Sequence, residues 1–370
     1  MRKASIVIPT YNEAPNVPVL IDELVKHLNG IDFEIILVDD DSPDGTWLKA
    51  IEEIVKRKLD GIVVRRLGIK GLATAVLDGI SFAKGRYAIV MDADLQHPPH
   101  YVPKLIKALD VSKCDIAIAT RYAPGGGVEG WSLIRKTISR LATLIAKLLL
   151  PEARKVSDPM SGFFAVNRDL VVNSREYLNP IGYKVLLEIL SRTNPRCIIE
   201  VPYTFKPRLA GKSKLGIKQI LHFILHVLTL SGWRPLKFAL VGLAGTVVNL
   251  ATLALLTLFM PILTSKLFAL GSAIAIEVST LFNFSLHEKW TFSDRRLGNP
   301  LNRLAKFHLS VAPAVATQYL VANALKYIAH LNPLVAQFIG IVLGFVVNYV
   351  LSELKVWKGK RINVVMLRET

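Results

Sequence analysis

Residues 87–99 read YAIVMDADLQHPP, a short apolar run that ends in Asp92, Asp94 and Gln96. The motif Asp-x-Asp is common by chance, but here it directly follows a run that is typical of a buried strand. Carboxylate and amide oxygens are hard ligands, which suit Mg²⁺ or Mn²⁺. The stretch therefore predicts a divalent metal site of the kind that joins a protein to the phosphates of a nucleotide.

Similar short apolar runs recur before and after this stretch, with amphipathic helical patterns between them. The predicted strands are 5–9, 33–38, 62–64, 87–91 and 115–120. This alternation predicts an α/β fold, in which a parallel sheet is covered by helices on both faces. In such sheets ligands bind beyond the carboxyl ends of the strands.

Acidic and aromatic residues gather at two further strand ends, PTYNE at 9–13 and VDDDSPDG at 38–45. Carboxylates so close together repel one another unless cations or hydrogen-bond donors meet them. Asp44 fits two roles equally well, a contact with a ligand at the strand end and a cap of the next helix. No Gly-x-x-x-x-Gly-Lys-Ser/Thr loop occurs, and no Gly-x-Gly-x-x-Gly follows the first strand, which excludes a P-loop enzyme and a dinucleotide-binding dehydrogenase.

Charge is unevenly distributed along the chain. The net charge is −2 over residues 1–120, +12 over 121–237 and +7 over 238–370, which argues against a uniformly basic nucleic-acid-binding protein. The two cysteines, Cys114 and Cys197, lie at no metal-ligand spacing. Because two cysteines make no disulfide framework, we expect none and a reducing compartment.

The last third of the chain is strongly apolar, and residues 238–265 contain no charge. A run of this length is long enough for a tilted membrane helix. The predicted transmembrane helices are about 238–260, 267–286, 307–328 and 331–352. Buried helices of a large soluble domain are the alternative.

Positive residues indicate how these helices are oriented. They follow the second and fourth predicted helices: Lys289, Arg295, Arg296, Arg303 and Lys306, then Lys355, Lys358, Lys360, Arg361 and Arg368. The positive-inside rule places these segments in the cytoplasm, and four spans return the N-terminal domain to the same side. We therefore expect a multi-pass membrane protein with its catalytic domain and C-terminus cytoplasmic.

The apolar region also repeats itself. KFAL at 237–240 corresponds to KFHL at 306–309, and NFSLHE at 283–288 corresponds to NYVLSE at 348–353. We infer a duplicated two-helix hairpin, with both copies in the same orientation. Polar residues at membrane depth are Asn249, Glu277, Asn283 and Asn348. Such residues are functional candidates, with hydrogen bonding between helices as the alternative.

The motifs taken together resemble the family 2 glycosyltransferases, which have a Rossmann-like GT-A fold. The matching stretches are IPTYNE (8–13), VDD (38–40), MDADLQHPP (91–99) and ATRY (119–122). Later stretches resemble the dolichyl-phosphate (polyprenyl-phosphate) mannose synthases within that family: DPMSGFF (158–164), EVPYTF (200–205) and RLAGKSKLG (208–216), where the synthases more often have Glu-Ser-Lys in place of Lys-Ser-Lys. Residues 236–357 resemble the GtrA-like four-helix membrane domain. We expect a GT-A domain over 1–230 and a GtrA-like transmembrane domain over 231–370.

The resemblance implies a reaction and a set of site residues. The reaction transfers mannose from GDP-mannose to dolichyl or another polyprenyl phosphate with inversion, giving dolichyl-phosphate mannose for glycosylation. The residues that would bind the nucleotide sugar are Pro9, Tyr11, Glu13, Val38, Asp40, Asp92, Ala93, Asp94, Gln96, Arg208 and Lys214. Asp94 and Gln96 would hold Mg²⁺ or Mn²⁺, and Asp92, Asp94 and Arg121 would be catalytic.

The acceptor in this reaction is already an anion, so it needs cations rather than a general base. The candidate cations are Arg121 at a strand end and Arg135, Lys136 and Arg140 on one helical segment. Of these, Arg121 and Arg135 are expected to bind the acceptor phosphate, with Ser139 one helical turn after Arg135. Amphipathic helices are predicted near 131–150 and 216–230, where they would lie at the membrane surface. The alternatives are a glucosyltransferase that uses UDP-glucose and a translocator of lipid-linked sugars with a non-catalytic N-terminal domain.

Overall fold

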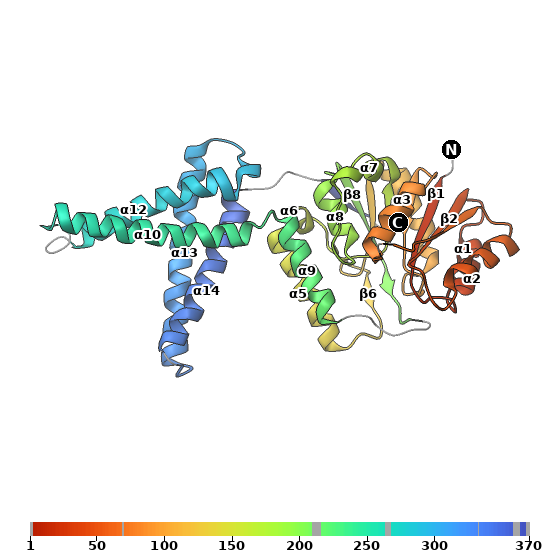
Figure 1. The fold of residues 1–370 in the computed structure, drawn as a ribbon, viewed down its shortest axis with the longest axis horizontal. Helices are drawn as coiled ribbons and strands as arrows, with labels where there is room; N and C mark the ends of the chain where they lie inside the picture. The colour runs from red at the N-terminus through yellow and green to blue at the C-terminus, as the bar shows by residue number, and fades with distance from the viewer. Residues whose placement is uncertain are drawn as a thin grey trace. The chain divides into compact units, whose positions relative to one another are not determined.

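The computed structural model describes residues 3–68, 70–208, 216–262, 268–331, 333–357 and 363–367. These residues form two compact units, which we describe separately. The first comprises residues up to Leu230 together with the C-terminal segment, and the second comprises Ser231–Gly359 (Figure 1).

A mixed sheet forms the centre of the first unit (Figure 1). Its strands are β1 (Ala4–Thr10), β2 (Phe33–Asp39), β3 (Gly61–Arg65), β4 (Tyr87–Val90), β5 (Ile116–Thr120), β7 (Phe164–Asn167), β8 (Cys197–Pro202) and β10 (Asn363–Met366). Their order is β10-β8-β5-β7-β4-β1-β2-β3, and β7 runs antiparallel to both of its neighbours. The five predicted strands correspond to β1–β5, so the predicted α/β class is confirmed.

Each face of the sheet has its own hydrophobic core, because successive side chains of a strand point to opposite faces. On β1, Ile6 and Ile8 face one core, and Val7 faces the other. Helices α1 (Val17–His27), α2 (Thr46–Lys56) and α4 (Val102–Ser112) contribute to the first core. Helices α3 (Leu72–Phe82), α7 (Arg168–Val172) and α8 (Val185–Arg192) contribute to the second.

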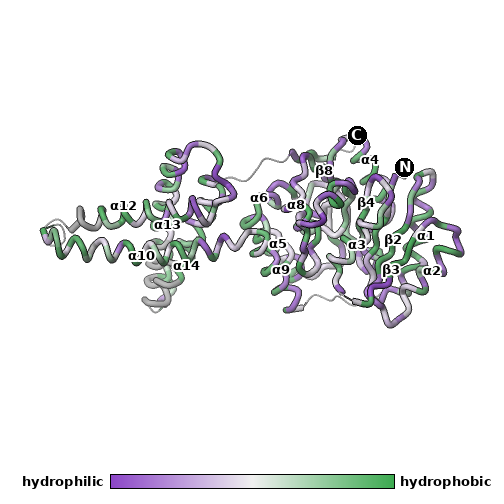
Figure 2. Tube along the Cα trace, turned by 45° about the horizontal axis from the view of Figure 1, so that its top comes forward, coloured by the Kyte–Doolittle hydropathy of each residue, from purple (hydrophilic) through white to green (hydrophobic). Residues whose placement is uncertain are grey.

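Two further helices of this unit, α5 (Leu133–Leu149) and α9 (Ile217–Leu230), lie side by side (Figures 1 and 2). With the short α6 (Pro151–Arg154) they build a third apolar cluster, which includes Ala146, Phe223 and Val227. Their outer faces leave large apolar side chains exposed: Leu133, Ile134, Leu141, Leu144, Ile217 and Leu221. The two predicted amphipathic helices are therefore present.

The remaining short elements connect these layers. They are η1 (Pro99–Tyr101), η2 (Arg175–Tyr177) and a two-stranded ladder of β6 (Gly127–Val128) with β9 (Thr204–Phe205). Strand β10 pairs in parallel with β8, although the sequence placed it with the membrane domain. The expected division at residue 230 therefore does not hold for the C-terminal strand.

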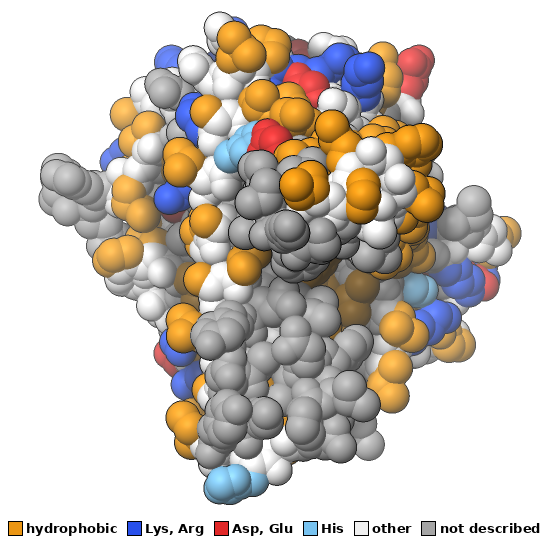
Figure 3. Space-filling view, turned by 90° about the vertical axis from the view of Figure 1, so that its left-hand side faces the viewer, with side chains coloured by type: hydrophobic (Ala, Val, Ile, Leu, Met, Phe, Trp, Pro, Cys, Tyr) orange, Lys and Arg blue, Asp and Glu red, His pale blue; other side chains and the backbone are white. Residues whose placement is uncertain are grey.

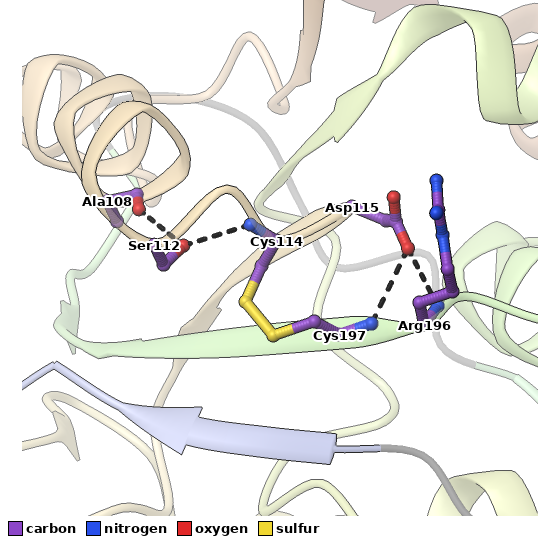
Figure 4. The surroundings of a disulfide bond; sticks show 6 residues. All are labelled: Ala108, Ser112, Cys114, Asp115, Arg196 and Cys197. Carbon is purple, nitrogen blue, oxygen red and sulfur yellow. Dashed lines mark hydrogen bonds between the residues drawn. A yellow bond between two sulfur atoms is a disulfide. The ribbon is translucent and has the colours of Figure 1, made fainter.

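A disulfide joins Cys114 and Cys197, which contradicts the expectation of unpaired thiols (Figure 4). Strands β5 and β8 are parallel neighbours in which Ile116 lies opposite Ile198. This register brings the two cysteines, at the amino ends of the strands, to a Cα–Cα distance of 4.6 Å. Spacing along the sequence could not reveal the pair, because the register of two distant strands brings the residues together. The cysteines therefore give no support for a reducing compartment.

The second unit consists of four long helices: α10 (Arg234–Phe259), α12 (Phe268–Leu286), α13 (Pro300–Tyr327) and α14 (Pro333–Leu351). Short turns follow the second and fourth of them: η3 (His287–Thr291) with η4 (Ser293–Arg295), and η5 (Ser352–Val356). Within the described part of the chain, α10 is the helix long and apolar enough to cross a membrane. Hydrophobic side chains reach the surface of this unit, as Figure 3 shows from one end.

Ion pairs connect the two copies of the internal repeat. Arg234 and Arg303 occupy equivalent positions in the two copies, and so do Glu288 and Glu353. Arg303 pairs with Glu288, and Arg234 Nε lies 3.6 Å from Glu353 Oε2. Each arginine at the start of one copy thus meets the glutamate at the end of the other.

Three of the four polar residues predicted at membrane depth make polar contacts between helices. Asn249 Nδ2 lies 3.5 Å from Ser279 Oγ, and Ser310 Oγ lies 3.4 Å from Asn348 Oδ1. His308 Nε2 lies 3.1 Å from Glu277 Oε1. These contacts are of the kind expected from hydrogen bonding between helices.

The disulfide predicts how many cysteines can be alkylated with and without reduction. Protein purified without reductant and unfolded in iodoacetamide is expected to carry no alkylated cysteine, since both sulfurs are bonded. Prior reduction should allow two alkylations, and Cys197→Ser should allow one without reduction. Intact-mass spectrometry counts the adducts, and two adducts on the unreduced wild-type chain would contradict the disulfide.

Candidate active site

The loop after β1 is fastened to the loop after β2. Pro9 and Val38 lie opposite each other in the ladder between these strands. The amide of Asn12 donates to Ser42 Oγ at 2.9 Å, and the amide of Glu13 donates to Thr46 Oγ1 at 2.9 Å. Beside these fixed positions Tyr11 is 41% exposed, so part of this residue is accessible to a ligand.

The carboxylates of the acidic loop each meet separate partners, as their mutual repulsion requires. Asp39 is buried and accepts from Thr10 Oγ1 at 2.9 Å and from the Ser42 amide at 2.8 Å. Asp44 accepts from the Thr46 amide at 3.0 Å, at the start of α2, as a cap would. The hydrogen bond from Arg65, opposed by desolvation, lowers the pKa of Asp41.

Asp40 sits between two donors from other segments. Its Oδ1 lies 3.1 Å from Arg66 Nε, and its Oδ2 accepts from the Gly71 amide at 2.7 Å. Both donors lie beyond β3, so the second strand end is connected to the start of α3. Asp40 is therefore held rigidly at the carboxyl edge of the sheet.

Three residues from the sequence motifs converge after β4. Arg208 Nε lies 2.9 Å from Asp94 Oδ2 and 2.8 Å from Gln96 Oε1. Leu95 adopts a left-handed conformation with φ of 61°, which places the side chains on either side of it around one point. Asp94 Oδ2 and Gln96 Oε1 therefore both contact one cation, the guanidinium of Arg208. Lys214, which was predicted beside them, lies outside the described residues.

This convergence fits a divalent ion. Burial, and then repulsion from Asp92, raise the pKa of Asp94, and a nearby cation relieves both effects. The described residues contain no group of three His, Cys, Asp or Glu side chains suited to a metal. The available ligand set is instead a carboxylate and an amide, to which a nucleotide's phosphates would add oxygens.

Asp92 and Ala93 complete this turn beside a buried histidine. The Asp92 amide donates to His97 Nδ1 at 3.0 Å, and the His97 ring stacks on Phe163 at a centroid distance of 5.2 Å. Burial lowers the pKa of His97 to about 4, so the neutral ring can accept this bond. A Cβ on Gly162 would lie 3.2 Å from His97 Cε1, so glycine keeps this contact open.

Arg121 at the end of β5 is paired with a buried carboxylate. Its Nε and Nη2 lie 2.7 and 2.9 Å from the two oxygens of Asp158. The sequence motif at 158–164 contained Asp158, but nothing in the pattern indicated this partner. Because the pair uses two guanidinium nitrogens, Arg121 is positioned firmly at the edge of the site.

The other predicted acceptor residues, Arg135 and Ser139, both lie on helix α5 and contact aromatic residues near Arg121. The Cζ atoms of Arg121 and Arg135 lie 5.5 and 4.4 Å from the centre of the Trp131 ring. Ser139 Oγ lies 2.8 Å from the Tyr122 hydroxyl, beside Arg121 in the chain. The structure thus brings together the three residues predicted to bind the acceptor phosphate.

Lys184 is a functional candidate that sequence reasoning missed. Its Nζ donates to the Met160 carbonyl at 3.1 Å. Burial and then repulsion from Arg121 lower the pKa of Lys184 to about 8, against attraction from Asp158 and Asp92. It therefore lies within electrostatic reach of both the metal-binding turn and the Arg121–Asp158 pair. A lone lysine before an apolar helix carries no sequence signal that would have identified it.

Comparison with known proteins identifies relatives over both units. The chain matches the model of glycosyl transferase family 2 over residues 5–173 and that of the GtrA/DPMS transmembrane domain over residues 237–357. A dolichol-phosphate mannosyltransferase of Pyrococcus furiosus is 41% identical over 360 residues, which is 96% of this chain and 99% of the relative. A dolichol-phosphate mannosyltransferase of Saccharomyces cerevisiae is 36% identical over 60% of this chain and 84% of the relative.

Solved structures resemble the first unit only weakly. Glucosyl-3-phosphoglycerate synthase from Mycobacterium tuberculosis, solved with phosphoglyceric acid, aligns with a TM-score of 0.47 and 21% identity. The alignment covers 62% of this chain and 80% of that chain. A likeness at this level supports no inference about the site.

The position of Lys184 predicts a pH dependence. A pKa of about 8 means that its ammonium loses its proton as pH rises through that value. If this cation supports bound anions, kcat/KM should fall above about pH 8. The variant Lys184→Gln should be slower at pH 7 and lack this decline, whereas Lys107→Gln on α4 should keep the wild-type profile. An unchanged decline in Lys184→Gln would assign the titration to another group.

Proposed function

The chain belongs to the dolichol-phosphate mannosyltransferases, and on that premise we propose that it transfers mannose from GDP-mannose to dolichyl or a related polyprenyl phosphate. The observation that carries this proposal is the convergence of Asp94, Gln96 and Arg208 at the carboxyl edge of the sheet. That point can hold a nucleotide diphosphate, because it offers metal-binding oxygens and a guanidinium together.

The donor would lie across the ends of β1, β2 and β4. The exposed Tyr11 ring offers a stacking surface to a base, and the Glu13 and Asp40 carboxylates can accept from base or ribose donors. Pro9, Val38 and Ala93 are buried, so they would meet the donor through backbone atoms, and Asp92 would face the sugar. Arg208, with Lys214 from the neighbouring segment, would neutralise the departing diphosphate.

Asp94 and Gln96 would hold the divalent ion. When bound, Mg²⁺ or Mn²⁺ would stabilise negative charge on the leaving diphosphate. The fit rests on the two oxygens that converge at one point and on the raised pKa of Asp94.

The acceptor would supply its own nucleophile. A phosphate monoester carries about −1.5 to −2 charge at pH 7, so one of its oxygens attacks without a general base. The new bond joins this oxygen to the anomeric carbon while the bond from that carbon to the GDP oxygen breaks, and its electron pair leaves with GDP. Attack on the face opposite the leaving group inverts the configuration. Arg121, Arg135 and Ser139 would hold the attacking phosphate.

The second unit makes the chain a membrane protein. We propose that α10, α12, α13 and α14 each span the bilayer and that the catalytic unit lies in the cytoplasm. The exposed apolar faces of α5 and α9 would then contact the membrane surface, where lipid phosphates lie. This arrangement would present the acceptor to the site without extracting its hydrocarbon chain from the bilayer.

A substrate comparison tests the proposed function. The full chain in vesicles is expected to transfer mannose from GDP-mannose to a polyprenyl phosphate, and to transfer glucose from UDP-glucose far more slowly. Radiolabelled sugar in the lipid phase measures both rates, and an acceptor without phosphate is the control. Preferential use of UDP-glucose would identify a glucosyltransferase, and failure of both donors would favour a non-catalytic domain.

The metal assignment predicts a large effect of Asp94→Asn. Loss of one ligand from a catalytic metal site should reduce transfer by about 10²-fold or more. Mn²⁺ should increase the affinity of the wild type for GDP-mannose in calorimetric titrations, and should do so much less in Asp94→Asn. Asp169→Asn, at an exposed position, is the matched control. Equal Mn²⁺ dependence in both variants would contradict the assignment.

A further inference from the structure

Two adjoining pockets are lined in part by residues of α5. The first has a volume of about 210 Å³ and is lined by Arg121, Tyr122, Gly126, Gly127, Val128, Lys136 and Arg140. The second has a volume of about 280 Å³ and is lined by Tyr122, Arg140, Thr143, Lys147 and Ser157. Because Tyr122 and Arg140 line both, the two pockets are neighbours, and we refer to them together as the groove.

Three groups of residues lie on different faces of the helix α5: a basic row, the predicted acceptor residues and an apolar face. At about 100° per residue, Lys136, Arg140 and Lys147 fall within about 40° of one another. Arg135 and Ser139 lie on one side of this basic row. The exposed apolar side chains lie on its other side: Leu133, Ile134, Leu141 and Leu144. The basic row thus separates the apolar face from the predicted acceptor residues.

The three cations of the row differ in their acidic neighbours, since Lys147 lies within electrostatic reach of Glu200. In the ranges that the structure describes, neither Lys136 nor Arg140 forms an ion pair with an acidic side chain. Arg121, which lines the same pocket, has its own partner in Asp158. Positive charges that share a pocket repel one another, and an anion between them removes the repulsion.

Tyr122 connects the groove to the site. Its hydroxyl lies 2.8 Å from Ser139 Oγ, while its side chain lines both pockets. A hydroxyl so placed can donate to or accept from a phosphate on the groove side. The groove is therefore continuous with the predicted acceptor position.

We propose that Tyr122, Lys136 and Arg140 form a second anion subsite, which captures the phosphate monoester of the lipid acceptor before it reaches Arg121 and Arg135. The inference rests on the proposed function, because it takes the acceptor to be a lipid phosphate. A lipid whose chain contacts the apolar face of α5 meets the basic row before it meets Arg135. The subsite selects the acceptor by charge, since a dianionic monoester pairs with two cations better than a monoanionic phosphodiester does.

Acceptor kinetics of the full chain in vesicles test this subsite. Lys136→Gln and Arg140→Gln should each raise the KM for polyprenyl phosphate by about tenfold, as expected for one lost charge-assisted hydrogen bond. The kcat at saturating acceptor and the KM for GDP-mannose should stay close to the wild-type values. Arg140→Lys should recover most of the loss, and Lys107→Gln on α4 is the control for a lost surface charge.

Vesicle composition separates the two sources of a lipid phosphate. The effect should persist in vesicles of phosphatidylcholine alone, which carry no net charge. A loss that occurs only when phosphatidylglycerol is added would assign the row to bulk anionic lipids and overturn the proposal. An unchanged acceptor KM in both variants, with mannose transfer intact, would also overturn it. Failure of the wild type to transfer mannose would instead count against the proposed function.

Binding measurements keep the test independent of turnover and folding. Calorimetric titration with a short-chain polyprenyl phosphate should show weaker binding in Lys136→Gln and Arg140→Gln. Titration with GDP-mannose should be unchanged, which shows that the variants are folded. Equal binding of the short-chain phosphate by all three proteins would contradict the subsite.

Discussion

Repulsion between carboxylates at one edge of the sheet is the constraint on which the rest of the site depends. The strands β1, β2, β4 and β5 end at this edge, and acidic residues follow β2 and β4. Two of them are met by arginines from other segments, Asp40 by Arg66 and Asp94 by Arg208. The buried Asp158 is met by Arg121 in the same way. Removing one partner of a buried ion pair costs about 3–5 kcal/mol, so these contacts fix the loops as well as the charges.

The same contacts explain how one site can accept two anions. Arg208 follows β9 and Arg121 follows β5, and each pairs with its own carboxylate, Asp94 or Asp158. A nucleotide diphosphate beside Arg208 and a lipid phosphate beside Arg121 would each have their own cation. Lys184 adds a further positive charge within electrostatic reach of Asp92 and Asp158. The excess charge of residues 121–237 therefore has a local purpose rather than a general affinity for polyanions.

The sequence predicted the parts of this arrangement that are local and missed those that depend on register. Asp94 and Gln96 directly follow a predicted strand, so the sequence places them at the carboxyl edge of the sheet. The family resemblance added Arg208. The roles of Asp158 and Lys184 depend on which side chains face them across the fold. The Cys114–Cys197 disulfide and the place of strand β10 both depend on pairing with β8. The paired residues are far apart in the sequence, and the local pattern of hydrophobic residues does not indicate such pairing.

The membrane unit shows the same dependence on distant partners, here between the copies of a repeat. Duplication of a hairpin would give two independent units if each arginine met the glutamate of its own copy. Instead Arg303 pairs with Glu288, and Arg234 lies beside Glu353. Phe292 and Trp357, which are also equivalent in the two copies, stack on each other at a centroid distance of 4.3 Å. Either copy alone would lack these contacts, so they stabilise the packing of the two hairpins against each other.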